Sequence, residues 1–127
     1  MLVIDSSALV GLLLGRSDVD AIARHLAEHG PELHAPHLID IEVLNLLARL
    51  DAADAFADFL EFPMQRYPHT ILGVRIWELR EHFSAYDAVY LALAENLADD
   101  GVPLLTSDVR FAKAARKHTD VEVLLAA

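Results

Sequence analysis

Two short apolar runs, each followed by an acid and a helix-forming segment, place the strongest constraint on the fold. Leu2–Ile4 contains no polar residue, as in a strand buried on both faces of a parallel sheet, and Asp5 follows it. Residues 103–106 repeat the pattern and lead into Ser107 and Asp108. Ligands of open α/β sheets bind beyond the carboxyl ends of the strands, so we predict that Asp5 and Asp108 lie where chemistry occurs.

The remaining apolar patterns alternate between strand-like and helix-like spacing. Ser6 and Ser7 are expected to cap the first helix, and Pro68 points to an edge position for its strand. The alternation predicts an α/β domain whose parallel sheet is covered by helices on both faces. Besides the two runs above, we predict strands at 33–35, 67–72 and 121–125, and helices at 8–14, 18–29, 38–50, 51–62, from 74, 84–95 and from 108.

Length and composition indicate one soluble domain. The chain has 127 residues, of which 54% are hydrophobic, enough for one core. It has no cysteine, which excludes disulfides and thiolate metal sites and fits a cytosolic compartment. No basic segment of a signal peptide precedes the first strand, and no apolar run approaches the roughly 18 residues of a membrane span. We expect one cytoplasmic domain over residues 1–127, without a membrane segment.

The formal net charge of −10 has the wrong sign for a protein that binds nucleic acid through bulk electrostatics. Composition alone therefore argues against RNA or DNA as a partner. Acids that gather at one site and are neutralised by divalent cations would present a different field to a phosphate. The net charge does not decide the question.

A third acid, Glu42, lies in the helix predicted at 38–50, within a stretch that is apolar on almost every side. An ionised carboxylate there is costly unless it is paired or bound to a metal. Asn45 and Arg49 follow at one-turn intervals, and this narrow polar stripe predicts a helix edge that faces a site. The alternative is a solvated acid favoured by the helix dipole, which suits Asp40 better because it lies nearer the helix start.

Asp87 and Asp108 each have a structural alternative to a role in chemistry. Ser84 and Asp87 have the spacing of a capping box, in which the Asp87 carboxylate would accept a hydrogen bond from the Ser84 N–H. Asp108 could be only the N-cap of the helix that follows it. Two acids at strand ends, Asp5 and Asp108, are harder to explain together by capping alone.

In the predicted fold, all four acids can reach one crevice. Like charges a few ångströms apart oppose one another's ionisation, and a hard divalent cation would neutralise them. Oxygen ligands favour Mg²⁺ or Mn²⁺ over zinc. Such an ion suits phosphodiester hydrolysis because it can activate a water and stabilise charge on the phosphate. A second ion about 4 Å away would give a two-metal site, and the number of ions stays open.

The last predicted helix carries four of the ten basic residues of the chain. Arg110 and Lys113 follow Asp108 closely and are the better placed for contacts with RNA phosphates. Arg116 and Lys117 come late in the helix, where basic side chains usually complement the helix dipole.

Two further patterns have a structural and a functional interpretation. Residues 25–29, His-Leu-Ala-Glu-His, match the H-x-x-E-H motif of inverted zincins, but we set zinc aside because they end a helix and no third ligand stands out. Phe56, Phe59 and Leu60 form one face of the helix at 51–62, which we assign to the core. The alternative for this face is a groove for the amphipathic helix of a partner.

Four segments together resemble a PIN domain, specifically a VapC-type toxin of a bacterial type II toxin–antitoxin module. The resemblance covers essentially the whole chain, and the order and spacing of the segments are specific although each acid alone is a weak signal. The segments are Asp5-Ser6 after the first strand, residues 41–45 around Glu42, residues 86–94 around Asp87, and residues 105–108 ending in Asp108.

The resemblance implies a PIN-like three-layer α/β/α domain with a central parallel sheet of four to five strands. It implies an endoribonuclease dependent on Mg²⁺ or Mn²⁺, with Asp5, Glu42, Asp87 and Asp108 as the catalytic and metal-binding quartet. Ser6 and Thr106 would be polar groups that support these ligands, and we add Asn45 from the polar stripe. The implied partners are RNA, a second copy of the chain, and a VapB-type antitoxin that forms a heterotetramer or larger complex.

Two functions other than RNA cleavage stay open as alternatives. An aspartyl-phosphate phosphotransfer domain would also place an Asp after its first strand, but Ser7 stands where a D-x-D motif has its second acid, and no Lys follows the last strand. A binding-only PIN-like domain would act by sequestering RNA or protein, which the intact set of acids disfavours.

Overall fold

A five-stranded, fully parallel sheet forms the middle layer of the protein. The structure is a computed structural model that describes residues 1–126. The strand order is β3-β2-β1-β4-β5, and every neighbouring pair is parallel. The predicted parallel sheet is thus confirmed. The strands are β1 (Leu2–Ile4), β2 (Leu33–Pro36), β3 (Gln65–Tyr67), β4 (Leu104–Thr106) and β5 (Val123–Leu125).

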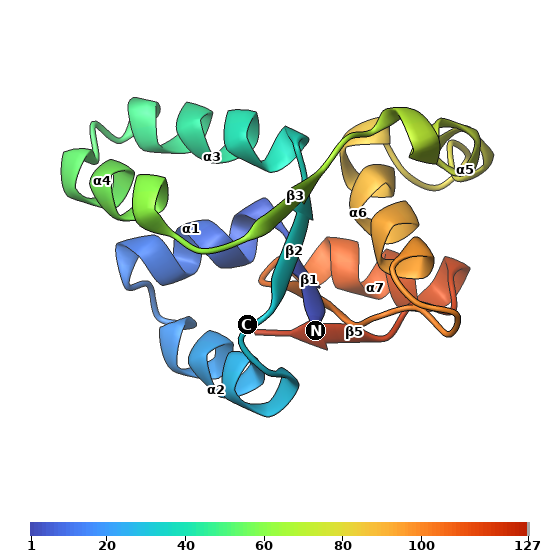
Figure 1. The fold of residues 1–127 in the computed structure, drawn as a ribbon, viewed down its shortest axis with the longest axis horizontal. Coiled ribbons are helices and arrows are strands. Elements are labelled where there is room, and N and C mark those ends of the chain that lie inside the picture. Colours follow the sequence, from blue (N-terminus) through green and yellow to red (C-terminus); the bar gives the residue numbers. More distant parts are fainter. Residues whose placement is uncertain (127) are drawn as a thin grey trace.

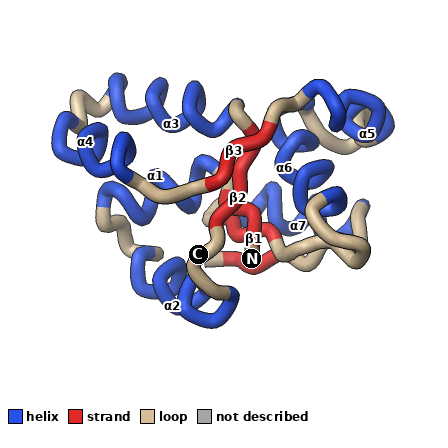
Figure 2. Tube along the Cα trace, in the orientation of Figure 1, coloured by secondary structure: helices blue, strands red, loops and turns tan. Residues whose placement is uncertain are grey.

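Helices cover both faces of this sheet, which gives the expected three-layer α/β/α architecture (Figures 1 and 2). Right-handed crossovers put the helices between β1 and β3 on one face, and the reversal of direction toward β4 puts the later helices on the other. The first group is α1 (Ser6–Leu14), α2 (Val19–His29), α3 (Leu38–Arg49) and α4 (Ala53–Glu61). The second is the 3₁₀ turn Thr70–Leu72, α5 (Gly73–Glu78), α6 (Ala85–Asn96) and α7 (Val109–His118).

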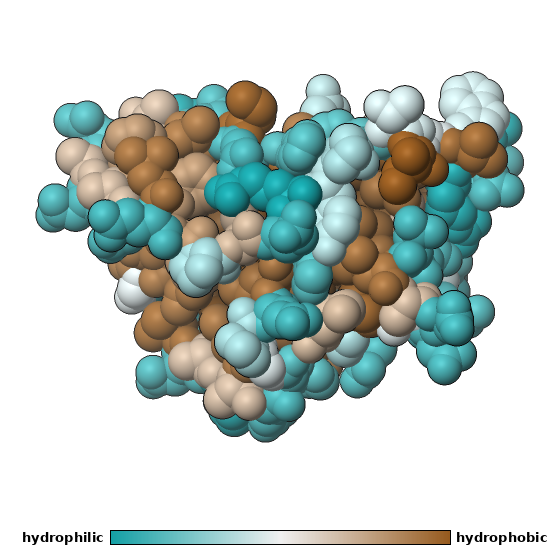
Figure 3. Space-filling view, in the orientation of Figure 1, coloured by the Kyte–Doolittle hydropathy of each residue, from teal (hydrophilic) through white to brown (hydrophobic). Residues whose placement is uncertain are grey.

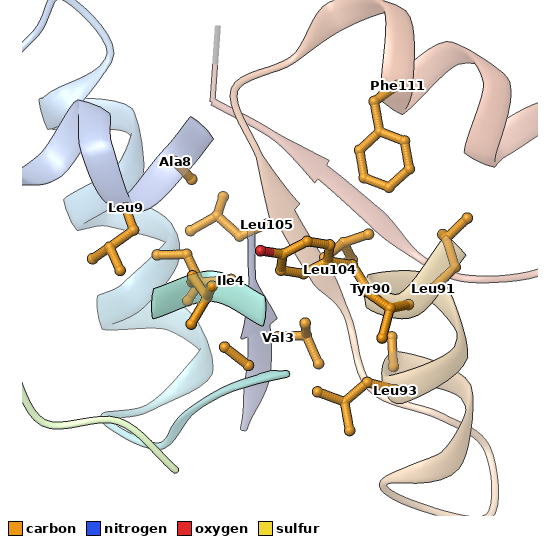
Figure 4. Packing of buried hydrophobic residues seen from close by; sticks show 14 of the residues in the cluster. Val3, Ile4, Ala8, Leu9, Tyr90, Leu91, Leu93, Leu104, Leu105 and Phe111 are labelled. Atoms are coloured by element: carbon orange, nitrogen blue, oxygen red, sulfur yellow. The ribbon is translucent and has the colours of Figure 1, made fainter. Parts of the chain in front are cut away.

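The core is built around β1, β4 and α6. Every residue of β1 is fully buried, as the continuous apolar run predicts. Seven consecutive residues of α6, 88–94, are also buried, because this helix packs on β1 and β2 and is itself covered by α5. Only the ends of α6 are therefore open to solvent. Figure 4 shows Tyr90, Leu91 and Leu93 of α6 among the side chains of β1 and β4. In the described part of the chain, no helix is both long and apolar enough to cross a membrane.

The bounds of the third strand and the cap of the first helix were predicted wrongly. The third strand is Gln65–Tyr67 rather than residues 67–72, because Pro68 lacks the N–H that a continuing strand needs and Thr70–Leu72 forms a 3₁₀ turn. Asp5, not Ser6 or Ser7, is the N-cap of α1, since its side chain accepts a hydrogen bond from the Ala8 N–H.

The aromatic face of α4 is only partly core. Phe59 is buried as predicted, but Phe56 and Leu60 are 42% and 67% exposed, so assigning the whole face to the core was wrong. An apolar groove runs between α3 and α4, lined chiefly by Leu44, Leu47, Ala48, Ala52 and Phe56. Hydrophobic side chains gather over this part of the molecule, at the left of the view in Figure 3. We call it the α3–α4 groove.

Gly101 lies in the turn that leads from α6 into β4, and Gly73, at the start of α5, is a control for it. Gly101 has a φ of +74°, and an added Cβ would lie 3.2 Å from the Ala94 carbonyl oxygen, whereas Gly73 has helical backbone angles and open space around it. We expect Gly101→Ala to lower the free energy of unfolding by about 1–3 kcal/mol. Gly73→Ala should raise it by roughly 0.5 kcal/mol. Urea denaturation measures both, and equal effects would contradict this account of the turn.

Candidate active site

The two acids that follow strands lie next to each other because β1 and β4 are neighbours. Ile4 is paired with Leu105, so Asp5 and Asp108 emerge from the same edge of the sheet, where the topology changes direction. Asp5 is only 5% exposed, whereas Asp108 is exposed to solvent. Asp5 therefore forms the floor of the site and Asp108 belongs to its rim.

Asp5 is held by hydrogen bonds to both of its carboxylate oxygens. Oδ1 accepts from the Ser7 hydroxyl at 2.7 Å and from the Ala8 N–H at 3.0 Å. Oδ2 accepts a short hydrogen bond from the hydroxyl of Thr106, which is fully buried. The Ser107 N–H donates to Ser7 Oγ at 3.0 Å and the Asp108 N–H donates to Thr106 Oγ1 at 3.0 Å. This network ties the end of β1 to the loop after β4.

The hydroxyl protons fix the polarity of this network. Ser7 and Thr106 have one proton each, and both protons are used in hydrogen bonds to Asp5. The 3.2 Å separation between Ser7 Oγ and Thr106 Oγ1 is then a contact between two oxygens that have no proton left for each other. The network is arranged to hold an ionised Asp5.

Burial opposes that ionisation. It raises the pKa of Asp5 from its ordinary value of 3.8 to about 6, and the nearby charge of Asp108 adds to the effect, while the bonds from Thr106, Ala8 and Ser7 lower it. At neutral pH, Asp5 is still mostly a carboxylate. Its negative charge is therefore kept at a cost to the stability of the metal-free protein.

Glu42 is linked to α6 through Tyr90. The Tyr90 hydroxyl donates to Glu42 Oε1 at 2.6 Å, and the Tyr90 side chain is 2% exposed. Figure 4 shows its ring reaching from α6 toward Leu105, with the hydroxyl at the far end. Burial and the negative charges of Glu42 and Asp5 raise the pKa of Tyr90, so its hydroxyl stays protonated and remains a donor. Glu42 is thus oriented and is not simply a solvated acid.

Asp87 lies at the first turn of α6, with its carboxylate available. Ser84 caps this helix by accepting a hydrogen bond from the Asp87 N–H at 3.2 Å. The reciprocal bond of a capping box, from the Ser84 N–H to the Asp87 carboxylate, is absent among the residues the structure describes. Burial raises the pKa of Asp87, and the charges of Asp108 and Glu42 add to it. These charge interactions indicate that Asp87 lies near Asp108 and Glu42.

Asp108 does act as the N-cap of α7, because its Oδ1 accepts a hydrogen bond from the Phe111 N–H at 3.0 Å. This confirms the capping alternative without excluding a second role, since the same carboxylate raises the pKa of Asp5 and of Asp87 through its charge. Asp5 also combines a cap with proximity to the other acids. The four predicted acids therefore share one end of the sheet.

The chemistry of these donors fits a hard divalent cation. Within residues 1–126, none of the four acids forms an ion pair with a basic side chain. Their oxygens are also more widely spaced than a closed cage requires, because no three of the four acids offer oxygens within 4.8 Å of one another in the described chain. Mg²⁺ usually keeps several waters and uses only one or two carboxylates, so an open cluster suits it.

The supporting residues predicted from the sequence fall in different places. Thr106 bonds Asp5 directly, and Ser6 lies beside the Tyr90 hydroxyl. Asn45 is exposed, and its side chain makes no hydrogen bond with the residues described. Arg110 and Lys113 are exposed on α7.

Sequence reasoning missed two residues of this site, Ser7 and Tyr90. The sequence predicts a capping role for Ser7, although a hydroxyl two residues after a buried acid is also a usable signal for a hydrogen bond to that acid. Tyr90 falls one turn after Asp87 in the helix sequence, but its bond to Glu42 spans 48 positions and has no local signal.

Comparisons with known proteins identify the family of this chain. The model of the PIN domain family matches residues 2–117. Ribonuclease VapC9 of Mycobacterium tuberculosis is 36% identical to this chain, and the match covers 98% of each protein. Ribonuclease VapC1 of the same organism is 37% identical, with 96% of each protein covered.

Solved structures support the fold. The crystal structure of Mycobacterium tuberculosis VapC20, a toxin described as cleaving the Sarcin-Ricin loop, has a TM-score of 0.68 at 21% identity, covering 90% of this chain and 95% of that one. A protein of Pyrobaculum aerophilum has a TM-score of 0.63 at 22% identity, covering 96% and 81%. The sequence matches and the common fold together establish that this chain belongs to the PIN-domain family and is a homologue of the VapC ribonucleases.

Proposed function

We propose that this protein is a metal-dependent endoribonuclease, the toxin of a VapBC-type toxin–antitoxin module, which acts in the cytoplasm. Asp5, Glu42, Asp87 and Asp108 would hold Mg²⁺ or Mn²⁺ and hydrolyse RNA phosphodiester bonds. The observation that carries the proposal is the coupling of these acids at one end of the sheet without a basic partner in the described chain. The relatives named above are ribonucleases, which supports RNA as the substrate class.

The protein contributes orientation and charge to this reaction. A bound divalent ion would supply an activated water and stabilise charge on the phosphate and the leaving oxygen. Ser7, Thr106 and the Ala8 N–H keep Asp5 ionised and fixed, and Tyr90 fixes Glu42. These supporting bonds hold two of the four carboxylates in place before the ion or the substrate arrives.

RNA would approach across the exposed rim formed by Asp87 and Asp108. Arg110 and Lys113 follow on α7, and we propose that they contact phosphates of the substrate. The net charge of −10 makes such contacts important, because the rest of the protein repels RNA. The RNA target itself can be found by sequencing RNA 5′ ends in cells that express the protein.

We further propose an antitoxin of the VapB type and a second copy of this chain as protein partners. The α3–α4 groove supports the first of these, because its lining, which includes the exposed Phe56, is mainly apolar and of the kind that an amphipathic segment covers. Membership of the PIN family argues against the phosphotransfer alternative. A binding-only domain remains the rival that experiments on the acids must test.

The first prediction concerns the quartet. Asp5→Asn, Glu42→Gln, Asp87→Asn and Asp108→Asn should each reduce RNA cleavage by at least about a hundredfold, since each removes a charged ligand. Cleavage of single-stranded and structured RNAs by the purified protein, freed of antitoxin, should require Mg²⁺ or Mn²⁺ and stop with EDTA.

A matched control is available on α4. Asp54→Asn and Asp58→Asn remove the same charge from exposed positions outside the quartet, and should leave cleavage within about twofold. Unchanged cleavage by several of the quartet variants would remove this site from consideration. Toxicity that survives Asp5→Asn in cells would favour the binding-only function.

The second prediction separates activity from stability. Asp5→Asn should abolish cleavage but raise the free energy of unfolding of the metal-free protein at pH 7.5. A pKa of about 6 instead of 3.8 corresponds to about 3 kcal/mol of destabilisation, of which we expect roughly 1–2 kcal/mol to be recovered, because the charge-assisted hydrogen bonds are weakened.

The pH dependence of this difference has a definite sign. The folded protein binds a proton on Asp5 more tightly than the unfolded chain does, so wild-type stability falls as the pH rises from about 4 to about 6. The advantage of Asp5→Asn should therefore be full above about pH 7 and vanish near pH 4. Denaturation with EDTA at both pH values measures it, and a variant less stable than wild type at pH 7.5 contradicts the prediction.

The third prediction concerns Tyr90 as a positioning residue. Tyr90→Phe keeps the ring but removes the donor to Glu42, and should raise the Mg²⁺ concentration for half-maximal cleavage by about tenfold. Excess Mg²⁺ should restore much of the rate. Tyr86→Phe is the control, because Tyr86 lies on the same helix and is 64% exposed. A rate loss with no change in Mg²⁺ dependence would exclude this role.

A further inference from the structure

Three metal-ligating side chains meet at the end of α2, apart from the acidic quartet. His25, Glu28 and His29 are spaced i, i+3 and i+4, which puts them on one face of the helix. One donor atom from each side chain lies within 4.8 Å of the other two. Within residues 1–126, this is the only group of at least three His, Asp or Glu donors that comes so close together.

The donor set differs in kind from the quartet. Two imidazoles and one carboxylate suit Zn²⁺ and similar transition ions, whereas Mg²⁺ prefers oxygen alone. Ligands of a tetrahedral zinc ion with bonds of about 2.0–2.1 Å lie about 3.3 Å from one another. The three donor atoms, which lie within 4.8 Å of one another, would have to move closer to reach that value when an ion binds. A water would complete the fourth position.

The surroundings of His25 and Glu28 supply a second observation. His25 Nδ1 is buried and has no hydrogen-bond partner among the residues described, although both histidines are only half-buried as whole residues. A buried ring nitrogen without a partner is unusual and costly. Glu28 is exposed and forms no ion pair in the described chain. A bound cation would satisfy a ring nitrogen and the carboxylate at once.

This group lies at the opposite end of the sheet from the quartet. The carbonyl oxygen of His29 accepts a hydrogen bond from the Met1 amino group, which precedes β1, whereas Asp5 follows β1. Figure 1 shows α2 next to the chain end that begins β1. An ion bound here would not reach the acids, and its effect would be on the last turn of α2 and on the turn into β2.

We propose that His25, Glu28 and His29 form a transition-metal site, with Zn²⁺ as the ion that fits best, which stabilises the fold and takes no part in RNA cleavage. The interpretation differs from that of an inverted zincin. There the Glu is a general base and a third ligand comes from elsewhere, whereas here Glu28 is itself the third ligand. A Glu28 that binds the ion is not free to act as a general base, which favours a structural site.

The test is a zinc titration of the full chain, with a competing chromophoric chelator and excess Mg²⁺ to occupy the carboxylate quartet. We expect one Zn²⁺ per chain, and a Co²⁺-loaded sample should show the visible spectrum of four-coordinate cobalt. His25→Gln, Glu28→Gln and His29→Gln should each weaken zinc binding by at least about tenfold. Zinc should also raise the thermal midpoint of the wild type by several degrees, and this shift should be lost in the variants.

Two controls make the outcome decisive. His82 and His118 form another close imidazole pair, with ring centroids 3.6 Å apart, and His82→Gln with His118→Gln should leave zinc binding unchanged. Asp5→Asn should also bind zinc normally. Equal zinc binding by the wild type and by the His25, Glu28 and His29 variants would overturn the proposal, as would loss of binding in Asp5→Asn. Circular dichroism confirms that each variant is folded, and Glu28→Gln, at an exposed position, remains informative if His25→Gln unfolds.

Discussion

Parallel pairing of β1 with β4 is the interaction on which the rest of the site depends. It brings segments about a hundred residues apart into register, so that Asp5 meets Thr106 and the backbone leading to Asp108. Ser7 donates a hydrogen bond to Asp5 and accepts one from the Ser107 N–H, and these two bonds join the two strand ends. Helices α3 and α6 then add Glu42, from the second turn of α3, and Asp87, from the first turn of α6, to this group of acids. Asp5, the most buried of the four acids, directly follows a strand of the sheet, which is the rigid part of the fold. Glu42 and Asp87 are carried by helices at the edge of the site.

Much of this arrangement follows from local sequence, because a short apolar run that ends in an acid predicts both the strand and the place where its acid emerges. The sheet and the positions of Asp5 and Asp108 at its carboxyl edge were predictable for that reason. The pairing of Glu42 with Tyr90 was not, because it depends on how α3 and α6 meet across the sheet. The predicted bounds of β3 are wrong because Pro68 ends this strand, whereas the prediction placed Pro68 inside a strand at the edge of the sheet. The exposure of Phe56 and Leu60 shows that an apolar helix face identifies a contact surface without saying whether the contact is within the chain.

Stability and chemistry make opposite demands at Asp5. The core around β1 excludes water almost completely, which is favourable for Leu2, Val3 and Ile4 and unfavourable for the carboxylate that follows them. Three neutral donors, from Ser7, Ala8 and Thr106, stabilise the Asp5 carboxylate in place of a basic side chain. A salt bridge would neutralise the acid and leave nothing for a cation to bind. Neutral donors keep the carboxylate fixed and charged, and thereby retain its ability to bind an ion.

The double use of Asp5 and Asp108 as N-caps limits the ways in which such a protein can lose its activity. Each side chain accepts a hydrogen bond from the first turn of the helix that follows it. An apolar replacement would therefore destabilise the start of α1 or α7 and also remove one acid of the quartet. Asparagine or serine would retain the cap and discard the charge. A descendant of this chain that abandoned hydrolysis but kept its shape would be expected to carry one of these short polar residues at positions 5 and 108. Inactive copies would then be recognised by a neutral cap in an otherwise intact scaffold.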